Sequence, residues 1–95
     1  MAVYVLVDID VREPGPYEDY KRGVPPLIAR HGGEYLVRGG AFEVIEGSFA
    51  AKRLVLFRFP DRASVQAFWD DPEYQELKAL RRRVAETTMV VIDGL

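Results

Sequence analysis

The 95-residue sequence predicts an α+β fold with elements in the order β-α-β-β-α-β. Three observations indicate this. Residues 3–9 alternate between two sets of side chains, as a strand requires. Apolar residues within 17–31 recur at spacings of three and four, as on one face of a helix. Glycine pairs at 32–33 and 39–40 then delimit a short β-rich segment, residues 35–38.

The first strand has two unlike rows of side chains. One row is wholly apolar and contains Val3, Val5, Val7 and Ile9. The other row mixes apolar and acidic residues and contains Tyr4, Leu6, Asp8 and Asp10. We expect the valine row to face the core.

The first helix is predicted from Pro16 to Arg30. Pro25 and Pro26 lack an amide N–H and crowd the carbonyl four residues earlier, so we expect a kink or split near Gly23. Gly32 suits the left-handed position that follows a helix C-terminus.

The second half repeats the strand and helix pattern. Phe42–Glu46 is predicted to form a hairpin extension after residues 35–38, and Arg53–Phe59 a strand that Pro60 stops. Asp61 is a predicted N-cap for a helix whose one face carries Val65, Phe68 and Trp69.

Asp71-Pro72-Glu73 restarts a helix, with Asp71 as cap and Pro72 at the first helical position. Its apolar stripe consists of Tyr74, Leu77, Leu80 and Val84, and Met89–Ile92 is the last strand.

This order is the ferredoxin-like plan, a four-stranded antiparallel sheet with both helices on one face and strands one and three central. The sheet would belong to a single domain, residues 1–95. Its other face also carries apolar residues, including Leu6, Leu54 and Leu56, and no residues remain to cover them. The cheapest cover is a second copy of the sheet, so we expect a homodimer, with higher oligomers open.

Composition limits the function classes. Apolar residues make up 48% of the chain and the net charge is −2, with acids and bases interspersed. Neither nucleic acid nor membrane is therefore expected as a partner. The chain has no cysteine and no signal-peptide pattern, which suits the cytoplasm.

His31 is the candidate for proton transfer, since its unperturbed pKa lies near neutrality. The alternative is a structural histidine at the helix C-terminus, bonded to a carbonyl. With no second histidine or carboxylate at ligand spacing, neither metal nor cofactor is expected.

Arg38 is the candidate for holding an anion. It shares with Asp8, Asp10 and Arg58 an unusual position within a strand, where a charge must find a partner or water. The alternative is a set of structural salt bridges at strand ends. A guanidinium in a pocket would favour a small carboxylate.

The aromatic residues with a polar group offer walls for such a site. Most of Tyr17, Tyr20, Tyr35, Trp69 and Tyr74 are expected in the core. We predict the ligand site beside His31, Tyr35 and Arg38, with Tyr20 and Trp69 as alternative wall residues. Tyr35 and Arg38 would point to opposite faces unless their strand carries a bulge.

Several short motifs carry a family resemblance. They are Asp10, Tyr17-x-x-Tyr20, His31-Gly32-Gly33, Leu36-Val37-Arg38-Gly39-Gly40, Glu46-Gly47, Phe59-Pro60 and Asp71-Pro72-Glu73-Tyr74. In this combination the chain resembles the family called domain of unknown function 1330. The resemblance implies a dimeric α+β barrel, as in cofactor-independent antibiotic-biosynthesis monooxygenases, but no established reaction.

Two functions therefore remain open. The first is a cofactor-independent enzyme acting on a small acidic or aromatic molecule in a pocket between sheet and helices. The second is a dimer that binds such a molecule without turnover. RNA binding, which shares this topology, is not favoured because residues 53–59 lack the glycine and aromatic pattern of RNA-recognition domains.

Overall fold

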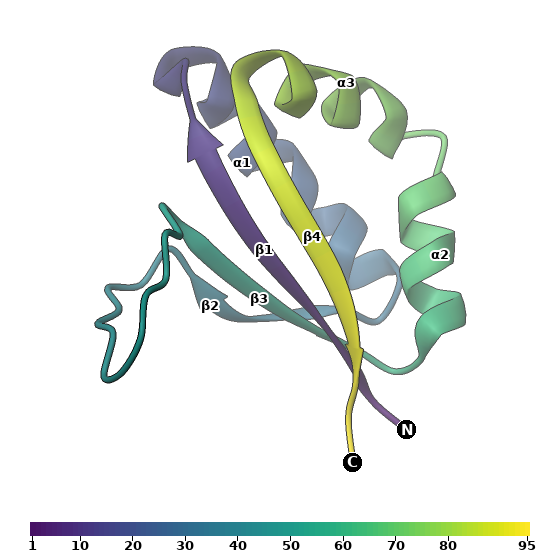
Figure 1. Ribbon diagram of the computed structural model, residues 1–95. Helices are drawn as coiled ribbons and strands as arrows, with labels where there is room; N and C mark the ends of the chain where they lie inside the picture. Colours follow the sequence, from purple (N-terminus) through teal and green to yellow (C-terminus); the bar gives the residue numbers. More distant parts are fainter.

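The computed structural model describes residues 1–95 and contains one four-stranded sheet with three helices (Figure 1). The elements are β1 (Val3–Val11), α1 (Pro14–Arg30), β2 (Glu34–Arg38), β3 (Leu54–Phe59), α2 (Arg62–Asp70), α3 (Tyr74–Val84) and β4 (Ala85–Asp93). The strand order is β2-β3-β1-β4, and every neighbouring pair is antiparallel. The predicted ferredoxin-like fold with strands one and three central is confirmed.

The register places the valine row of β1 against the helices, as predicted. Val5 pairs with Phe57 of β3 and Val91 of β4, and all three contribute to the core between sheet and helices. Figure 1 shows all three helices on this one side of the sheet. The opposite face therefore has no cover within the chain.

That open face is apolar at its centre. Leu6 pairs with Leu56 of β3 on one side and with Val90 of β4 on the other. Ile92, two residues after Val90, lies on the same face and pairs with Tyr4. Val90 and Ile92 are 45% and 47% exposed. Alternation alone predicted this arrangement.

Helix α1 runs without interruption from Pro14 to Arg30, so the two prolines do not split it. It begins two residues before the predicted Pro16. Gly23 lies against Leu77 of α3, where an added Cβ would come within 2.9 Å of the leucine methyl groups. This close approach packs α1 on α3.

The predicted hairpin extension at Phe42–Glu46 is wrong. Residues 39–53 form a loop without strands, which projects from the sheet in Figure 1. The rings of Phe42 and Phe49 meet across it at 5.8 Å, yet no ladder forms. A two-stranded ribbon beyond the end of a sheet has no core to pack on, and such ribbons are marginal in water.

Caps determine where the last helices begin and end. Asp61 accepts a hydrogen bond from the Ser64 amide at 2.7 Å, which confirms the predicted N-cap and holds the pKa of its carboxyl below the usual value. Asp71 accepts from the Glu73 amide at 2.9 Å, although α3 begins at Tyr74 and not at the predicted Pro72. None of the helices combines the length and apolarity that crossing a bilayer requires.

Candidate functional site

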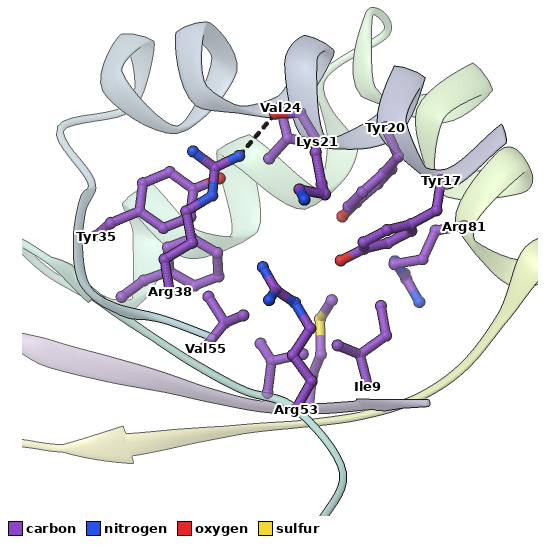
Figure 2. Close-up of a pocket in the computed structure, with 13 residues that line it drawn as sticks. Ile9, Tyr17, Tyr20, Lys21, Val24, Tyr35, Arg38, Arg53, Val55 and Arg81 are labelled. Atoms are coloured by element: carbon purple, nitrogen blue, oxygen red, sulfur yellow. Dashed lines mark hydrogen bonds between the residues drawn. The ribbon is translucent and has the colours of Figure 1, made fainter. Parts of the chain in front are cut away.

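A cavity between α1 and the sheet gathers cationic and phenolic side chains (Figure 2). We call it the cationic cavity. Its polar lining consists of Tyr17, Tyr20, Lys21, Tyr35, Arg38, Arg53 and Arg81, and its apolar floor of Val7, Ile9, Val24, Val55, Phe57 and Met89. Four cations line it, and no aspartate, glutamate or histidine does.

A β-bulge brings Tyr35 and Arg38 to the same face of β2. The pairing shifts between Tyr35 and Val37, so that Tyr35 lies opposite Phe57 and Arg38 opposite Val55, both core residues. The extra residue turns Arg38 toward the helices. Its guanidinium carbon then lies 4.7 Å from the centre of the Tyr35 ring.

Arg38 is held by the helix above it. Its Nη2 donates a hydrogen bond of 2.8 Å to the main-chain carbonyl of Lys21. That carbonyl would ordinarily accept from the amide four residues later, but residue 25 is proline and has none. Pro25, which was expected to kink or split the helix, therefore leaves the Lys21 carbonyl free to accept this bond at the mouth of the cavity.

Arg53 enters the cavity from the end of the loop that leads into β3 (Figure 2). A Cβ built on Gly39 would lie 2.6 Å from the guanidinium carbon of Arg53, so the arginine occupies the space that this glycine leaves. Gly39 also has a φ of +72°, which favours glycine. The Nε of Arg53 is buried and has no hydrogen-bond partner.

Arg81 of α3 reaches the cavity from the other end. It is 4% exposed, and its Nε is also buried without a partner. None of the ion pairs in the structure includes Arg38, Arg53 or Arg81. Arg81 is buried, Arg53 is half-buried and Arg38 is exposed. A buried guanidinium without an anion is costly, so Arg81 above all makes the cavity electrostatically suited to a negatively charged ligand.

The tyrosines supply neutral hydrogen-bonding groups. Tyr20 and Tyr74 share a buried hydrogen bond of 2.9 Å between their hydroxyl groups, and the Tyr17 ring stacks on Tyr20 at 5.6 Å. Burial raises the pKa of Tyr20 well above its usual value and also raises the pKa of Tyr35. Both phenols therefore stay protonated at neutral pH and can donate to an anion.

His31 lies outside the cationic cavity. Its Nε2 is 2.8 Å from Oδ2 of Asp71, whose side chain is 6% exposed, and Arg30 contacts the same oxygen at 3.1 Å. The hydrogen bond from His31 is the main reason why the pKa of the Asp71 carboxyl falls below its usual value, followed by the bond from the Glu73 amide. This cluster joins the end of α1 to the turn between α2 and α3. His31 therefore bonds a carboxylate and not the carbonyl expected in the structural alternative.

Trp69 lines a neighbouring cavity, which we call the apolar cavity. It has a volume of about 230 Å³ and is surrounded by Val5, Phe57, Phe59, Val65, Phe68, Trp69, Tyr74, Met89 and Val91, with Tyr20, Val24 and Gln66. Tyr20 lines both cavities. Of the predicted site residues, Tyr20, Tyr35 and Arg38 thus meet in the cationic cavity, whereas Trp69 lies next door and His31 apart.

The remaining charges within strands lie on the open face. Arg58 contacts Glu34 at 3.5 Å, and Asp8 accepts a hydrogen bond of 2.9 Å from the Lys52 amide. The Arg58 contact agrees with the structural alternative of salt bridges, whereas Asp8 bonds a main-chain amide. Arg38 is the exception, because the bulge turns it inward.

Sequence reasoning missed Arg53 and Arg81 as site residues. Arg81 belongs to the run Arg81-Arg82-Arg83, which reads as a solvated helix face. The signal was its spacing: Arg81 follows Tyr74 and Leu77 by seven and four residues, which places it on the buried stripe of α3. No comparable local signal identifies Arg53, because a loop of 15 residues brings it beside Gly39.

The chain belongs to the family described as domain of unknown function (DUF1330), whose model matches residues 2–95. No curated protein matches it at a significant level. It is similar to the crystal structure of a protein of unknown function from Rhodopseudomonas palustris, at 18% identity and a TM-score of 0.79, covering 99% of this chain and 82% of the other.

Two further structures show the same fold. SnoaB, a cofactor-independent oxygenase from Streptomyces nogalater, is 11% identical with a TM-score of 0.69, covering 99% of this chain and 93% of SnoaB. A dimeric ferredoxin-like protein of unknown function from Thermobifida fusca is 14% identical with a TM-score of 0.69, covering 99% and 92%. At these identities the likeness concerns the fold.

Proposed function

We propose that this protein is a cofactor-independent enzyme that acts on a small aromatic acid whose carboxylate binds in the cationic cavity. The observation that carries the proposal is the convergence of Arg38, Arg53 and Arg81, without any carboxylate, on a space lined by phenols. A guanidinium fork matches a carboxylate, and aromatic walls match a ring. The shared fold of SnoaB supports an enzyme of this kind but assigns no reaction.

The cavity would act by stabilising negative charge. Preorganised cations lower the pKa of an acidic O–H or C–H group in a bound substrate, because they favour its anion. The proton would leave to water through the mouth beside Lys21 and Arg38. The enolate or phenolate that results would remain paired with the arginines.

The second candidate is a dimer that binds the same acid without turnover. It is favoured by the absence of a histidine or carboxylate from the lining of the cavity, since no side chain there is suited to take a proton at neutral pH. Both candidates share one ligand class and differ in whether product forms.

The assembly in either case is a homodimer formed by the open faces of two sheets. Leu6, Leu56, Val90 and Ile92 would become its buried centre. Neighbours of this fold are described as dimeric, which supports the proposal. The cysteine-free composition supports a location in the cytoplasm.

Thermal shift with matched ligand pairs tests the proposal. Phenylacetate and 4-hydroxyphenylpyruvate should raise the melting temperature, whereas benzylammonium, of similar size and opposite charge, should not. Incubation of each stabilising acid followed by mass spectrometry then separates the two candidates. New product supports the enzyme, unchanged acid supports the binder, and no stabilisation by any acid contradicts both.

A further inference from the structure

The cationic and apolar cavities share a wall. Four residues line both of them: Tyr20, Val24, Phe57 and Met89. The cationic cavity itself has a volume of about 30 Å³, room for roughly one or two water molecules. It can hold a charged head group, but an aromatic ring needs more space.

The apolar cavity offers that space. Its volume of about 230 Å³ exceeds the roughly 150 Å³ at which an apolar protein cavity binds benzene. Eleven of its 12 lining residues are hydrophobic, and the hydroxyl groups of Tyr20 and Tyr74 share a hydrogen bond. It is suited to the ring or tail of a ligand whose head lies next door.

Three of the four shared residues are fixed in place. Tyr20 is held by its hydrogen bond to Tyr74 and by the ring of Tyr17. Val24 is 2% exposed on α1, and Phe57 packs against Tyr35 with ring centres 4.7 Å apart. None of them can move without loss of core contacts.

Met89 differs from the other three. It lies on β4, an edge strand, and is partly exposed. Its side chain is unbranched, with three rotatable bonds, so it changes rotamer more easily than a β-branched or aromatic residue does. Met89 also lines the groove beside Trp69, Arg81 and Thr87 at this edge, toward which it can swing.

We propose that Met89 is a movable partition between the two cavities, and that the ligand is an amphipathic aryl-alkyl carboxylate with its head among the arginines and its ring beside Trp69. This inference rests on the proposed function for the site of the head group. It adds that Met89 is a specificity-determining residue, which selects ligands by the length and shape of their tails. Acids too short to pass Met89 would bind by their charge alone.

A homologous series of acids tests the partition. Calorimetric titration with benzoate, phenylacetate, 3-phenylpropanoate and 4-phenylbutanoate should give affinities that rise about fourfold per added methylene once the ring enters the apolar cavity. Trp69 is the sole tryptophan of the chain, so its fluorescence reports on this cavity. The 4-bromophenyl analogues of the long acids should quench it, and 4-bromobenzoate should not.

Two variants test whether Met89 is the residue that selects the ligand tail. Met89→Ala should raise the affinity for 2-naphthylacetate at least tenfold, because the wider passage admits a larger ring. Met89→Leu, of similar volume, should keep the wild-type order and confirms that the fold tolerates a change here. The titrations on wild-type protein stand even if Met89→Ala does not fold.

The outcomes separate the two proposals. If acids bind but chain length has no effect and Trp69 is not quenched, the partition is wrong while the cationic site stands. If no acid of the series binds, the proposed function fails and the partition with it. Equal affinity of Met89→Ala and wild type for 2-naphthylacetate would also overturn the assignment of Met89.

Discussion

Arg38 donates a hydrogen bond of 2.8 Å to the Lys21 carbonyl, which is the carbonyl that Pro25 leaves without a helical partner. Arg38, which a bulge in β2 turns inward, therefore satisfies the carbonyl that Pro25 leaves without a partner in α1. The pair connects helix to sheet at the mouth of the cationic cavity. Its energetic consequences can be measured.

The first prediction is a coupling between residues 25 and 38. Arg38→Met should lower the free energy of unfolding by about 1 kcal/mol, since one hydrogen bond from a charged donor is lost at an exposed site. In the Pro25→Ala background the alanine amide can bond the Lys21 carbonyl, so the same change should cost much less. Urea unfolding of the four proteins in a double-mutant cycle measures the difference. Equal costs in both backgrounds would show that the two residues act independently.

The second prediction concerns Gly39. Gly39→Ala should destabilise the protein by about 1 kcal/mol or more, because φ is positive there and an added Cβ collides with Arg53. It should also weaken acid binding, since Arg53 must move. Gly32→Ala, at a φ of +77° far from the arginines, should lower stability without affecting binding. Gly40→Ala is the matched control, as its Cβ would meet nothing nearer than 3.9 Å.

The third prediction concerns acid stability. The folded protein lowers the pKa of Asp71, mainly through His31, so the carboxylate contributes stability above its unfolded pKa of about 3.9. That contribution is lost as the pH falls below this value toward the lower folded pKa. Asp61, whose pKa is also lowered, acts in the same window.

Asp71→Asn should therefore destabilise the protein at pH 7 and flatten the decline of unfolding free energy between pH 5 and pH 3. Denaturant titrations across this range measure the effect. Asp70→Asn, one residue earlier and bonded to Gln66, serves as control and should keep the wild-type curve. His31→Gln should lower stability and leave the binding of acids unchanged. A loss of acid binding in His31→Gln would show that this histidine contributes to the ligand site.

The fourth prediction is the homodimer. Light scattering after size exclusion should give about twice the monomer mass of 10.8 kDa. Leu6→Asp should produce a folded monomer, because Leu6 lies at the centre of the open face between Leu56 and Val90. Arg83→Asp, on the exposed side of α3, should leave the mass unchanged. A wild-type monomer at micromolar concentration would contradict the proposed assembly.

Much of the fold could be predicted from the sequence because its signals are local. Alternation in residues 3–10 identified both faces of β1, and the Asp61 cap identified the start of α2. The loop at 39–53 could not be predicted as such, since its apolar residues resemble a strand and only the lack of a packing surface prevents one.

The site could be predicted less completely from the sequence, because it depends on contacts between residues far apart in the chain. The sequence suggested Tyr35 and Arg38 as site residues and indicated that a bulge would be needed to bring them to one face, but nothing local indicates that β2 has one. Arg53 joins the site through its approach to Gly39, 14 residues earlier in the chain. His31 had the right chemistry for catalysis, yet Asp71, 40 residues away, fixes its place.

Arginines without an ion-pair partner make the cationic cavity suited to the carboxylate of a small aromatic acid. The most direct measurement is calorimetric titration of phenylacetate into wild type, Arg53→Met and Arg58→Met. Arg58 lies on the opposite face and pairs with Glu34, so its variant controls for the loss of one positive charge. If the arginines bind the carboxylate, Arg53→Met should lose about tenfold or more in affinity, while Arg58→Met should match wild type. Equal affinity of all three proteins, or binding of benzylammonium as tight as that of phenylacetate, would contradict it.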